Sequence, residues 1–276
     1  NGGTRSGLAG DTLDRLRRRG FTAGDTGNAP SDLNVRRVQV WSTVENDPRA
    51  WIVREGAERS DPTPYPDYPN PAASPVTLHL EAGGTGSGGL NGVGGLALSP
   101  LPNQGTEALV DNVSFSGSAL AQAEWTNHRL LYATPELTEA VHLSGTPSIT
   151  VRVASSTPAA NLSVWLVALP WTEGPRSPES LITRGWADPQ NHRSLIESEP
   201  LVPGQFYELT FNLQPDDQVI PVGQQIGLMI MSSDRDFTLW PRPGTELSID
   251  LDSLVLQLPV VGGRAALERA FRSTSD

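Results

Sequence analysis

The stretch "SITVRVA" (148–154) alternates apolar and polar side chains. Its apolar residues fall on every second position, as Ile149, Val151 and Val153. Such a period of two is typical of a β-strand that buries one face and exposes the other. The stretch "QFYELTFNL" (205–213) repeats the pattern, so the same strand type is predicted at two distant places in the chain.

Similar short runs, bounded by turn residues, recur from residue 35 onward. We predict strands at 35–41, 50–54, 76–81, 129–133, 139–144, 148–154, 162–169, 205–213, 225–233, 246–250 and 254–260. Almost no helical pattern separates them, and parallel strands would need crossover helices. The 24 prolines and 27 glycines suit the many turns. The sequence therefore predicts an all-β fold, an antiparallel jelly-roll β-sandwich with short peripheral helices.

The chain divides into three predicted segments. Residues 1–34 are expected to be a linker or the tail of a preceding domain, with one short helix at 11–20. Residues 35–263 are expected to form the sandwich, and residues 264–276 a short C-terminal helix and tail. Residues 83–126 show the weakest pattern, and we expect a long loop across the sandwich surface. The sequence starts with Asn1 rather than Met, as expected of a processed product or fragment.

The composition of the 276-residue chain excludes several classes of function. There is no cysteine, so disulfides, thiolate metal sites and cysteine nucleophiles are absent. The net charge of −11 argues against nucleic acid or an anionic membrane as a partner. No apolar run is long enough to span a bilayer. The compartment stays open, since such a chain suits the bacterial cytoplasm and secretion equally.

The stretch "TRGWADPQNHRSL" (183–195) places Asp188, His192 and Ser194 within seven residues. A catalytic triad needs its Ser and Asp on opposite sides of the imidazole ring. Spacing this tight in a proline-containing loop, with Ser194 starting a further strand, seldom allows that. We interpret "ADPQN" (187–191) as a turn in which Asp188 caps the backbone before Pro189. A hydrolase with an unconventional site around Asp188 and His192 is the third of three hypotheses.

Two other motifs resemble catalytic or cofactor sites only superficially. The glycines of "GTGSGG" (84–89) match a dinucleotide fingerprint, but the following residues cannot start the required helix. We predict a flexible loop there and no cofactor. A nucleophile elbow needs Gly two positions before and after its Ser. Ser87 and Ser116 both lack the first glycine, so no catalytic residue is predicted.

The sequence predicts no metal site. His79, His128 and His142 are scattered without metal-ligand spacing. The pairs Asp216–Asp217 and Asp234–Asp236 could bind calcium in loops. Solvated turns are the favoured interpretation of both pairs.

Three long segments of the strand-rich region are similar to a known domain. They are "RLLYATPELTEAVHLSGTPSITVRVASSTPAANLSVWLVAL" (129–169), the stretch 183–195, and "SEPLVPGQFYELTFNLQPDDQVIPVGQQIGLMIMSSDRDFTLWPRPGTEL" (198–247). Together they resemble the C-terminal β-sandwich, a galactose-binding-like jelly roll, of the Xaa-Pro dipeptidyl-peptidase, cocaine-esterase-like and α-amino-acid ester hydrolase family. The resemblance covers about 36–263, is specific over 129–262 and is weak before residue 76.

The resemblance implies a role without catalysis on this chain. In that family a Ser, Asp, His triad belongs to an α/β-hydrolase domain that precedes the sandwich, and no residue here maps onto it. The implied function is a non-catalytic sandwich that packs on the hydrolase domain and shapes its substrate cleft. The parent would release Xaa-Pro dipeptides or hydrolyse esters. The hydrolase partner would belong to the same protein or to a separate chain, and the sequence leaves homo-oligomers open.

Exposed aromatic side chains at strand ends are the candidates for a docking or ligand surface. We predict Trp186, Phe237 and Trp240 for this role, with edge packing inside the sandwich as the alternative. The seven tryptophans also allow a second hypothesis, a free-standing carbohydrate- or ligand-binding jelly-roll module. Trp125, Trp171 and Trp186 would form its platform. Trp165 lies within a strand pattern and is expected in the core.

Overall fold

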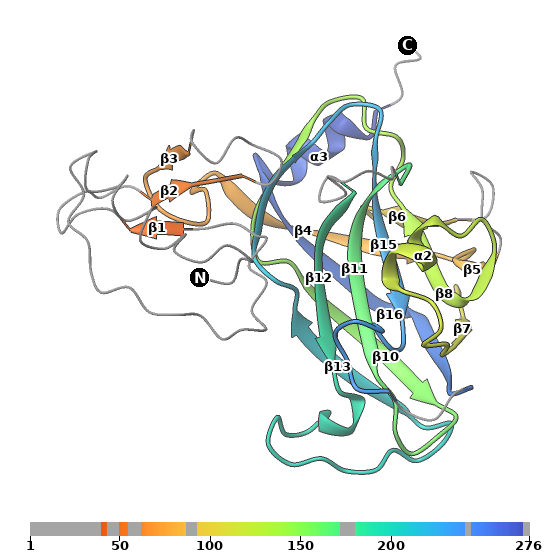
Figure 1. The fold of residues 1–276 in the computed structure, drawn as a ribbon. Coiled ribbons are helices and arrows are strands. Elements are labelled where there is room, and N and C mark those ends of the chain that lie inside the picture. The colour runs from red at the N-terminus through yellow and green to blue at the C-terminus, as the bar shows by residue number, and fades with distance from the viewer. Residues whose placement is uncertain are drawn as a thin grey trace.

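Two β-layers face each other in the computed structural model, which describes residues 40–42, 50–54, 62–86, 93–171, 180–240 and 244–272 (Figure 1). One layer has the order β12 (Leu181–Ala187), β11 (Leu162–Leu169), β15 (Gln225–Met231), β8 (Thr126–Ala133). The other has the order β4 (Ala73–Glu81), β16 (Glu246–Val261), β10 (Ser148–Ser155), β13 (Phe206–Asn212). The predicted all-β sandwich is confirmed.

Shorter strands complete the layers. β6 (Gly94–Ala97) joins them, running parallel to β8 and antiparallel to β4. Among the other pairings are β5 (Thr85–Gly86) on β8, β7 (Thr106–Val110) on β16, and β9 (Val141–Gly145) on both β14 (Asp216–Ile220) and β16. A separate three-stranded sheet holds β1 (Val40–Ser42), β2 (Ala50–Ile52) and β3 (Thr63–Tyr65). The described residues include the helices α2 (Gly117–Gln122) and α3 (Gly263–Ala270) and the 3₁₀ turn η2 (Pro189–Asn191).

The main core lies between the two layers, as the alternation predicts. Ile149, Val151 and Val153 are buried in β10, whereas Arg152 is exposed. Strand β11 differs, because all of its eight residues are buried. Its even-numbered apolar residues enter the main core, while Trp165, Val167 and Leu169 join a second cluster that includes Leu120 and Ala121 of α2. A strand covered on both faces loses its alternating pattern.

The expected long loop at 83–126 is wrong. Its described residues contain β5, β6, β7 and α2. Glycines hide these strands from a propensity argument, since glycine weakens a strand pattern. The tertiary structure explains these glycines, because a Cβ atom at Gly84 or Gly94 would collide with the ring of Tyr132.

Other predicted boundaries also shift. The segments 246–250 and 254–260 form the single strand β16, and strands β12 and β14 were not predicted. The C-terminal helix is confirmed as α3. The predicted helix at 11–20 and the predicted domain boundary at 34–35 lie outside the described residues. Among the described residues, no helix is both long and apolar enough to cross a membrane.

Candidate functional site: an aromatic cluster and an N-terminal strap

Asp188, His192 and Ser194 do not form a triad. Asp188 caps η2 by accepting a hydrogen bond from the backbone N of Gln190 at 2.9 Å, as the turn interpretation predicts. The Nδ1 atom of His192 lies 3.2 Å from the backbone O of Pro189. Ser194 accepts from two backbone N–H groups further along its own loop. The prediction that Ser194 begins a strand is wrong, because the chain stays irregular up to β13.

An aromatic cluster forms where β11, β12 and the loop after β15 meet. We define it as Trp165, Arg184, Trp186, Asp234 and Phe237. The Nε1 atoms of Trp165 and Trp186 donate to the same Oδ2 atom of Asp234, at 3.0 and 3.1 Å. The rings of Trp186 and Phe237 stack with centroids 5.5 Å apart. The guanidinium carbon of Arg184 lies 3.6 Å from the Phe237 centroid.

The carboxyl group of Asp234 is fully buried in this cluster. Burial raises its pKa above the ordinary value, because the charged form loses its hydration. The two indole donors and the charge of Arg184 act in the opposite direction. Charge-assisted hydrogen bonds of this kind fix the orientation of both indole rings.

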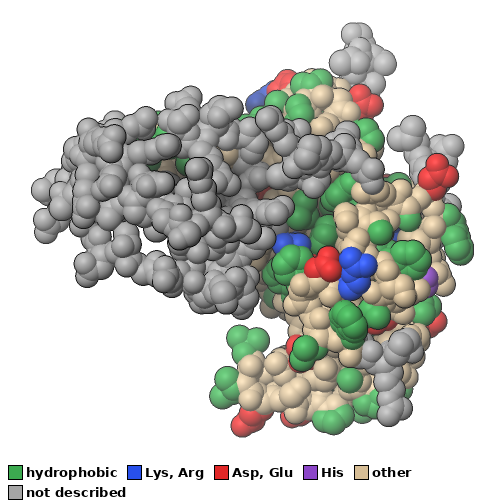
Figure 2. Space-filling view, viewed as in Figure 1, with side chains coloured by type: hydrophobic (Ala, Val, Ile, Leu, Met, Phe, Trp, Pro, Cys, Tyr) green, Lys and Arg blue, Asp and Glu red, His purple; other side chains and the backbone are tan. Residues whose placement is uncertain are grey.

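The cluster leads to an exposed apolar surface at one end of the sandwich. Phe237 is 54% exposed, Leu239 91% and Trp240 60%. Strands β12 and β15 both run antiparallel to β11, so the loops that follow them leave from the same end. The loop after β12 carries Leu195 and Ile196, which are more than 90% exposed. Figure 2 shows hydrophobic side chains on the loop that projects at the lower left.

Of the three residues predicted for the docking or ligand surface, two have rings that stack on each other. Trp186 and Phe237 contact each other, and Trp186 is half-buried because its ring also serves internal packing. Trp240 lies in the same loop as Phe237 and donates from Nε1 to the backbone O of Arg235. Of the three tryptophans predicted for a carbohydrate platform, Trp125 is exposed, whereas Trp171 and Trp186 are half-buried. Trp165 is a core residue, as predicted.

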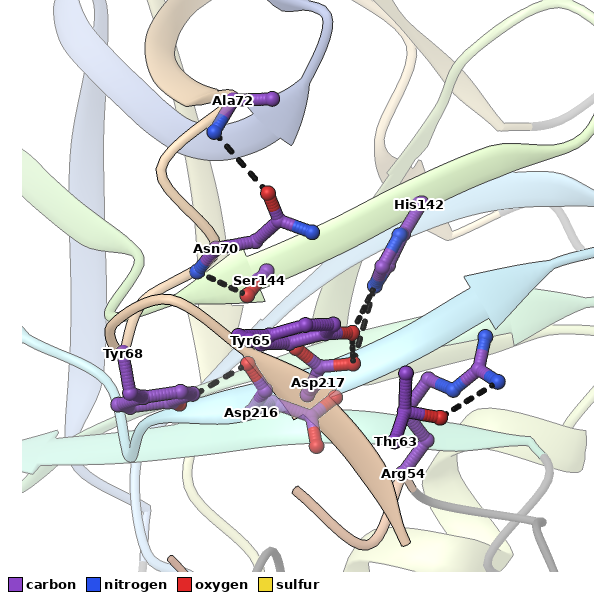
Figure 3. Close-up of polar contacts among 10 residues, drawn as sticks. All are labelled: Arg54, Thr63, Tyr65, Tyr68, Asn70, Ala72, His142, Ser144, Asp216 and Asp217. Atoms are coloured by element: carbon purple, nitrogen blue, oxygen red, sulfur yellow. Dashed lines mark hydrogen bonds and ion pairs between the residues drawn. The ribbon is translucent and has the colours of Figure 1, made fainter. Parts of the chain in front are cut away.

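A second polar site lies under the strap, which we define as residues 63–72, where it crosses β9 and β14 (Figure 3). The Oη atom of Tyr65 donates to Oδ1 of Asp217 at 3.0 Å. The Nε2 atom of His142 lies 2.9 Å from the same oxygen. Asp217 is fully buried, so these contacts replace the water that its carboxylate would otherwise need.

Backbone contacts extend the strap along the same two strands. The Oη atom of Tyr68 donates to the backbone O of Asp216 at 3.3 Å. The backbone N of Asn70 donates to Oγ of Ser144 at 2.9 Å. The strap is therefore fixed to both β9 and β14.

The prediction of solvated turns at Asp216–Asp217 and Asp234–Asp236 is wrong for three of these four residues. Asp216 and Asp217 are buried in β14, and Asp234 is buried in the aromatic cluster; only Asp236 is exposed. The donors to Asp217 and Asp234 come from Tyr65, Trp165 and Trp186, which local sequence cannot indicate. Within the described ranges, no group of three or more His, Cys, Asp or Glu side chains could hold a metal ion.

Because the strap buries the phenol of Tyr65, we expect the domain to lose stability at alkaline pH. Burial, followed by the charge of Asp217 and its hydrogen bond, raises the pKa of Tyr65 from 10.0 to about 12. The folded state thus holds the phenolic proton more tightly than the unfolded chain does. The stabilisation is complete below pH 10 and is lost as the pH rises towards 12. Thermal melts across this pH range, with tyrosinate absorbance, would measure it.

Two phenylalanine variants separate this effect from general alkaline unfolding. Tyr65→Phe should cost about 1 kcal/mol at neutral pH and remove part of the alkaline decline. Tyr68→Phe removes the second phenol of the strap, whose pKa is also raised by burial, so it should remove a separate part of the decline and retain the Tyr65 contribution. Identical alkaline profiles for wild type and Tyr65→Phe would contradict the prediction.

The geometry defines a β-sandwich domain whose described residues form packing sites and no catalytic triad. Residues 38–268 match the family model of the X-Pro dipeptidyl-peptidase C-terminal non-catalytic domain. The chain therefore belongs to this family, and the resemblance inferred from its strand segments is confirmed. A second family model, LytR cell envelope-related transcriptional attenuator, matches residues 1–61, most of which lie outside the described residues.

Known relatives and structures are considerably longer than this chain. A Rhodopirellula baltica protein, assigned by name as an Xaa-Pro dipeptidyl-peptidase, is 59% identical over 82% of this chain and 35% of its own length. A Bacillus anthracis protein of the same assignment is 32% identical over 78% of this chain and 34% of its own length. The crystal structure of an aminopeptidase from a Thaumarchaeota archaeon shares the fold, with a TM-score of 0.55 and 16% identity. That match covers 73% of this chain and 39% of the archaeal one. The chain thus spans about a third of the length of the curated relatives it matches.

Proposed function

We propose that this sandwich packs against an α/β-hydrolase portion of the same protein and helps to shape the substrate cleft there. The observation that carries the proposal is the length relation. The chain matches a non-catalytic domain, and about two thirds of each named peptidase relative lies outside the match. The parent activity is the release of Xaa-Pro dipeptides from peptide substrates, the activity that gives those relatives their name.

The exposed end of the aromatic cluster is the proposed docking surface. It offers Phe237, Leu239 and Trp240 as apolar anchors, with Arg235 and Asp236 as charged neighbours. Buried aromatic anchors with a polar rim are the usual composition of interface centres. Exposed apolar side chains that gather on one surface commonly mark an interaction site.

The first experiment tests for catalysis on the chain alone. The purified chain would be incubated with a fluorophosphonate probe and with a chromogenic Xaa-Pro anilide. We expect neither covalent labelling nor turnover. Labelling of any serine would overturn the proposal, and the labelled residue would identify an active site on this chain.

The second experiment tests docking. The Rhodopirellula baltica relative, truncated to remove its matching sandwich, would be mixed with this chain, and binding would be measured together with anilide turnover. We expect an increase in turnover with this chain. The double variant Phe237→Ala/Trp240→Ala should weaken binding at least tenfold, because truncating an interface anchor commonly costs about 2 kcal/mol or more.

Trp125→Ala is the matched control for docking. Trp125 is 67% exposed but lies outside the aromatic cluster, so its variant should bind like the wild type. Equal binding by the double variant and the wild type would exclude the aromatic surface as the docking site. Retained turnover with no added effect of this chain would argue against docking altogether.

A further inference from the structure

Three aromatic rings surround one cation in the aromatic cluster. The guanidinium carbon of Arg184 lies 5.5 Å from the ring centroid of Trp165, 5.4 Å from that of Trp186 and 3.6 Å from that of Phe237. Rings at such distances attract a cation through their negative faces. The carboxyl group of Asp234 accepts hydrogen bonds from both indoles, and the charge of Arg184 favours its ionised form.

The walls of this site are held in place independently of the cation. Trp165 and Trp186 lie on the paired strands β11 and β12, and both indole N–H groups bond to Oδ2 of Asp234. Arg184 is opposite Trp165 in the same strand register. Two walls and the cation therefore come from the rigid sheet, while the third wall, Phe237, comes from a loop.

The loop 234–240 is fixed at its base and is exposed beyond it. The backbone N–H groups of Phe237 and Thr238 both donate to the backbone O of Asp234, at 2.9 Å. Beyond this turn, the ring contacts of Phe237 are those with Trp186 and Arg184. The 3.6 Å contact with the cation links the middle of the loop to the sheet. Near the end of the loop, Nδ2 of Asn161 donates to the backbone O of Leu239.

We infer that Trp165, Trp186 and Phe237 form a binding site for a planar guanidinium cation, and that the chain's own Arg184 occupies it. Occupancy of this site holds the loop 234–240 in the conformation that presents Leu239 and Trp240. Arg184 is accordingly a positioning residue for the surface. Only the identity of the docking partner rests on the proposed function; the cation site rests on the contacts within this chain.

Chemical rescue tests the inference. Arg184→Ala empties the site, and hydrogen exchange followed by mass spectrometry reports the Phe237 and Thr238 amides. We expect their protection to fall about tenfold, the factor that corresponds to a cation–π contact of ~1.4 kcal/mol. Millimolar methylguanidinium chloride should restore the protection along a saturable curve. Sodium chloride at equal ionic strength should not.

The matched control is Arg193→Ala. It removes the same side chain from an exposed loop, where Arg193 pairs with Glu199 at 3.4 Å and contacts no ring of the cluster. Protection at Phe237 and Thr238 should stay unchanged there, with and without methylguanidinium. The double variant Arg184→Ala/Phe237→Ala lacks a wall and should show no saturable rescue in the amide of Thr238.

Several results would overturn the inference. They are unchanged protection in Arg184→Ala, equal rescue by sodium chloride, and saturable rescue in the double variant. Should Arg184→Ala fail to fold, Arg184→Lys provides the test. Lysine keeps the charge but not the planar shape, so protection should fall partially, and full protection would refute a site selective for guanidinium.

Docking measurements on the same variants separate this inference from the proposed function. If both hold, Arg184→Ala weakens docking to the truncated relative and methylguanidinium restores it. If the wild-type chain does not dock at all, the proposed function fails, whereas rescue of amide protection still establishes the cation site.

Discussion

Trp165→Ala is expected to lower the free energy of unfolding by about 3–5 kcal/mol, the usual cost of truncating a buried aromatic residue. Trp165 is 5% exposed and belongs to the second apolar cluster under α2. Its ring lies so close to Gly117 that no side chain could be added there. Its loss would also remove one of the two indole donors to Asp234. Urea unfolding followed by circular dichroism would measure the change.

Trp125→Ala supplies the control for that measurement, because it removes the same side chain from an exposed position. Its effect should stay within about 0.5 kcal/mol. Similar values for the two variants would show that Trp165 is not the structural link that its contacts indicate. Trp165→Phe would separate packing from hydrogen bonding, since it keeps an aromatic ring and removes the donor.

Arg129→Met is the second large effect, expected to cost about 2–4 kcal/mol. Arg129 is 2% exposed and donates to the backbone O atoms of Leu120 and Ala123, at 2.6 and 2.7 Å. Burial lowers its pKa to about 10, which still leaves it charged at neutral pH. Methionine fills a similar volume but leaves the two carbonyls at the end of α2 without their donors.

Arg152→Met is the corresponding exposed control. Arg152 pairs with Asp250 at 2.7 Å on the outer face of β10, and surface pairs contribute about 0–1 kcal/mol. Urea unfolding of both variants, with hydrogen exchange over α2, would make the comparison. Equal destabilisation by the two substitutions would refute the capping role of Arg129, as would unchanged exchange in α2.

The aromatic cluster shows how far sequence reasoning reaches into the candidate site. Phe237 and Trp240 are exposed, and they lie in the loop 234–240 rather than at the end of a strand. Their role in docking stays a prediction. The partnership of Arg184 and Asp234 with these rings was not predicted. The sequence predicts no strand at Arg184, because Gly185 beside it weakens the strand pattern of β12. A local sequence pattern cannot predict a contact between residues that lie fifty positions apart in the chain, such as Arg184 and Asp234.

The burial of Asp217 under the strap is a second feature that the sequence did not predict, and the reason is energetic. Two adjacent carboxylates indicate a solvated turn, because burying a charge without partners is costly. Tyr65 and His142 supply partners for one carboxyl oxygen of Asp217, yet they lie 152 and 75 positions away in the chain. Hydrogen-bond donors brought together by the fold decide whether such a residue is buried.

The sequence by itself determined the strand periodicity, the all-β class, the absence of cysteine chemistry and the family of the domain. These properties are local or compositional: a period of two follows from the geometry of one strand, and the family pattern follows the order of residues. The tertiary structure alone decided the strands between residues 83 and 126, the burial of three aspartates and the cation site around Arg184. Each depends on atoms from distant segments, since close backbone approach and the satisfaction of a buried charge are properties of the packed chain.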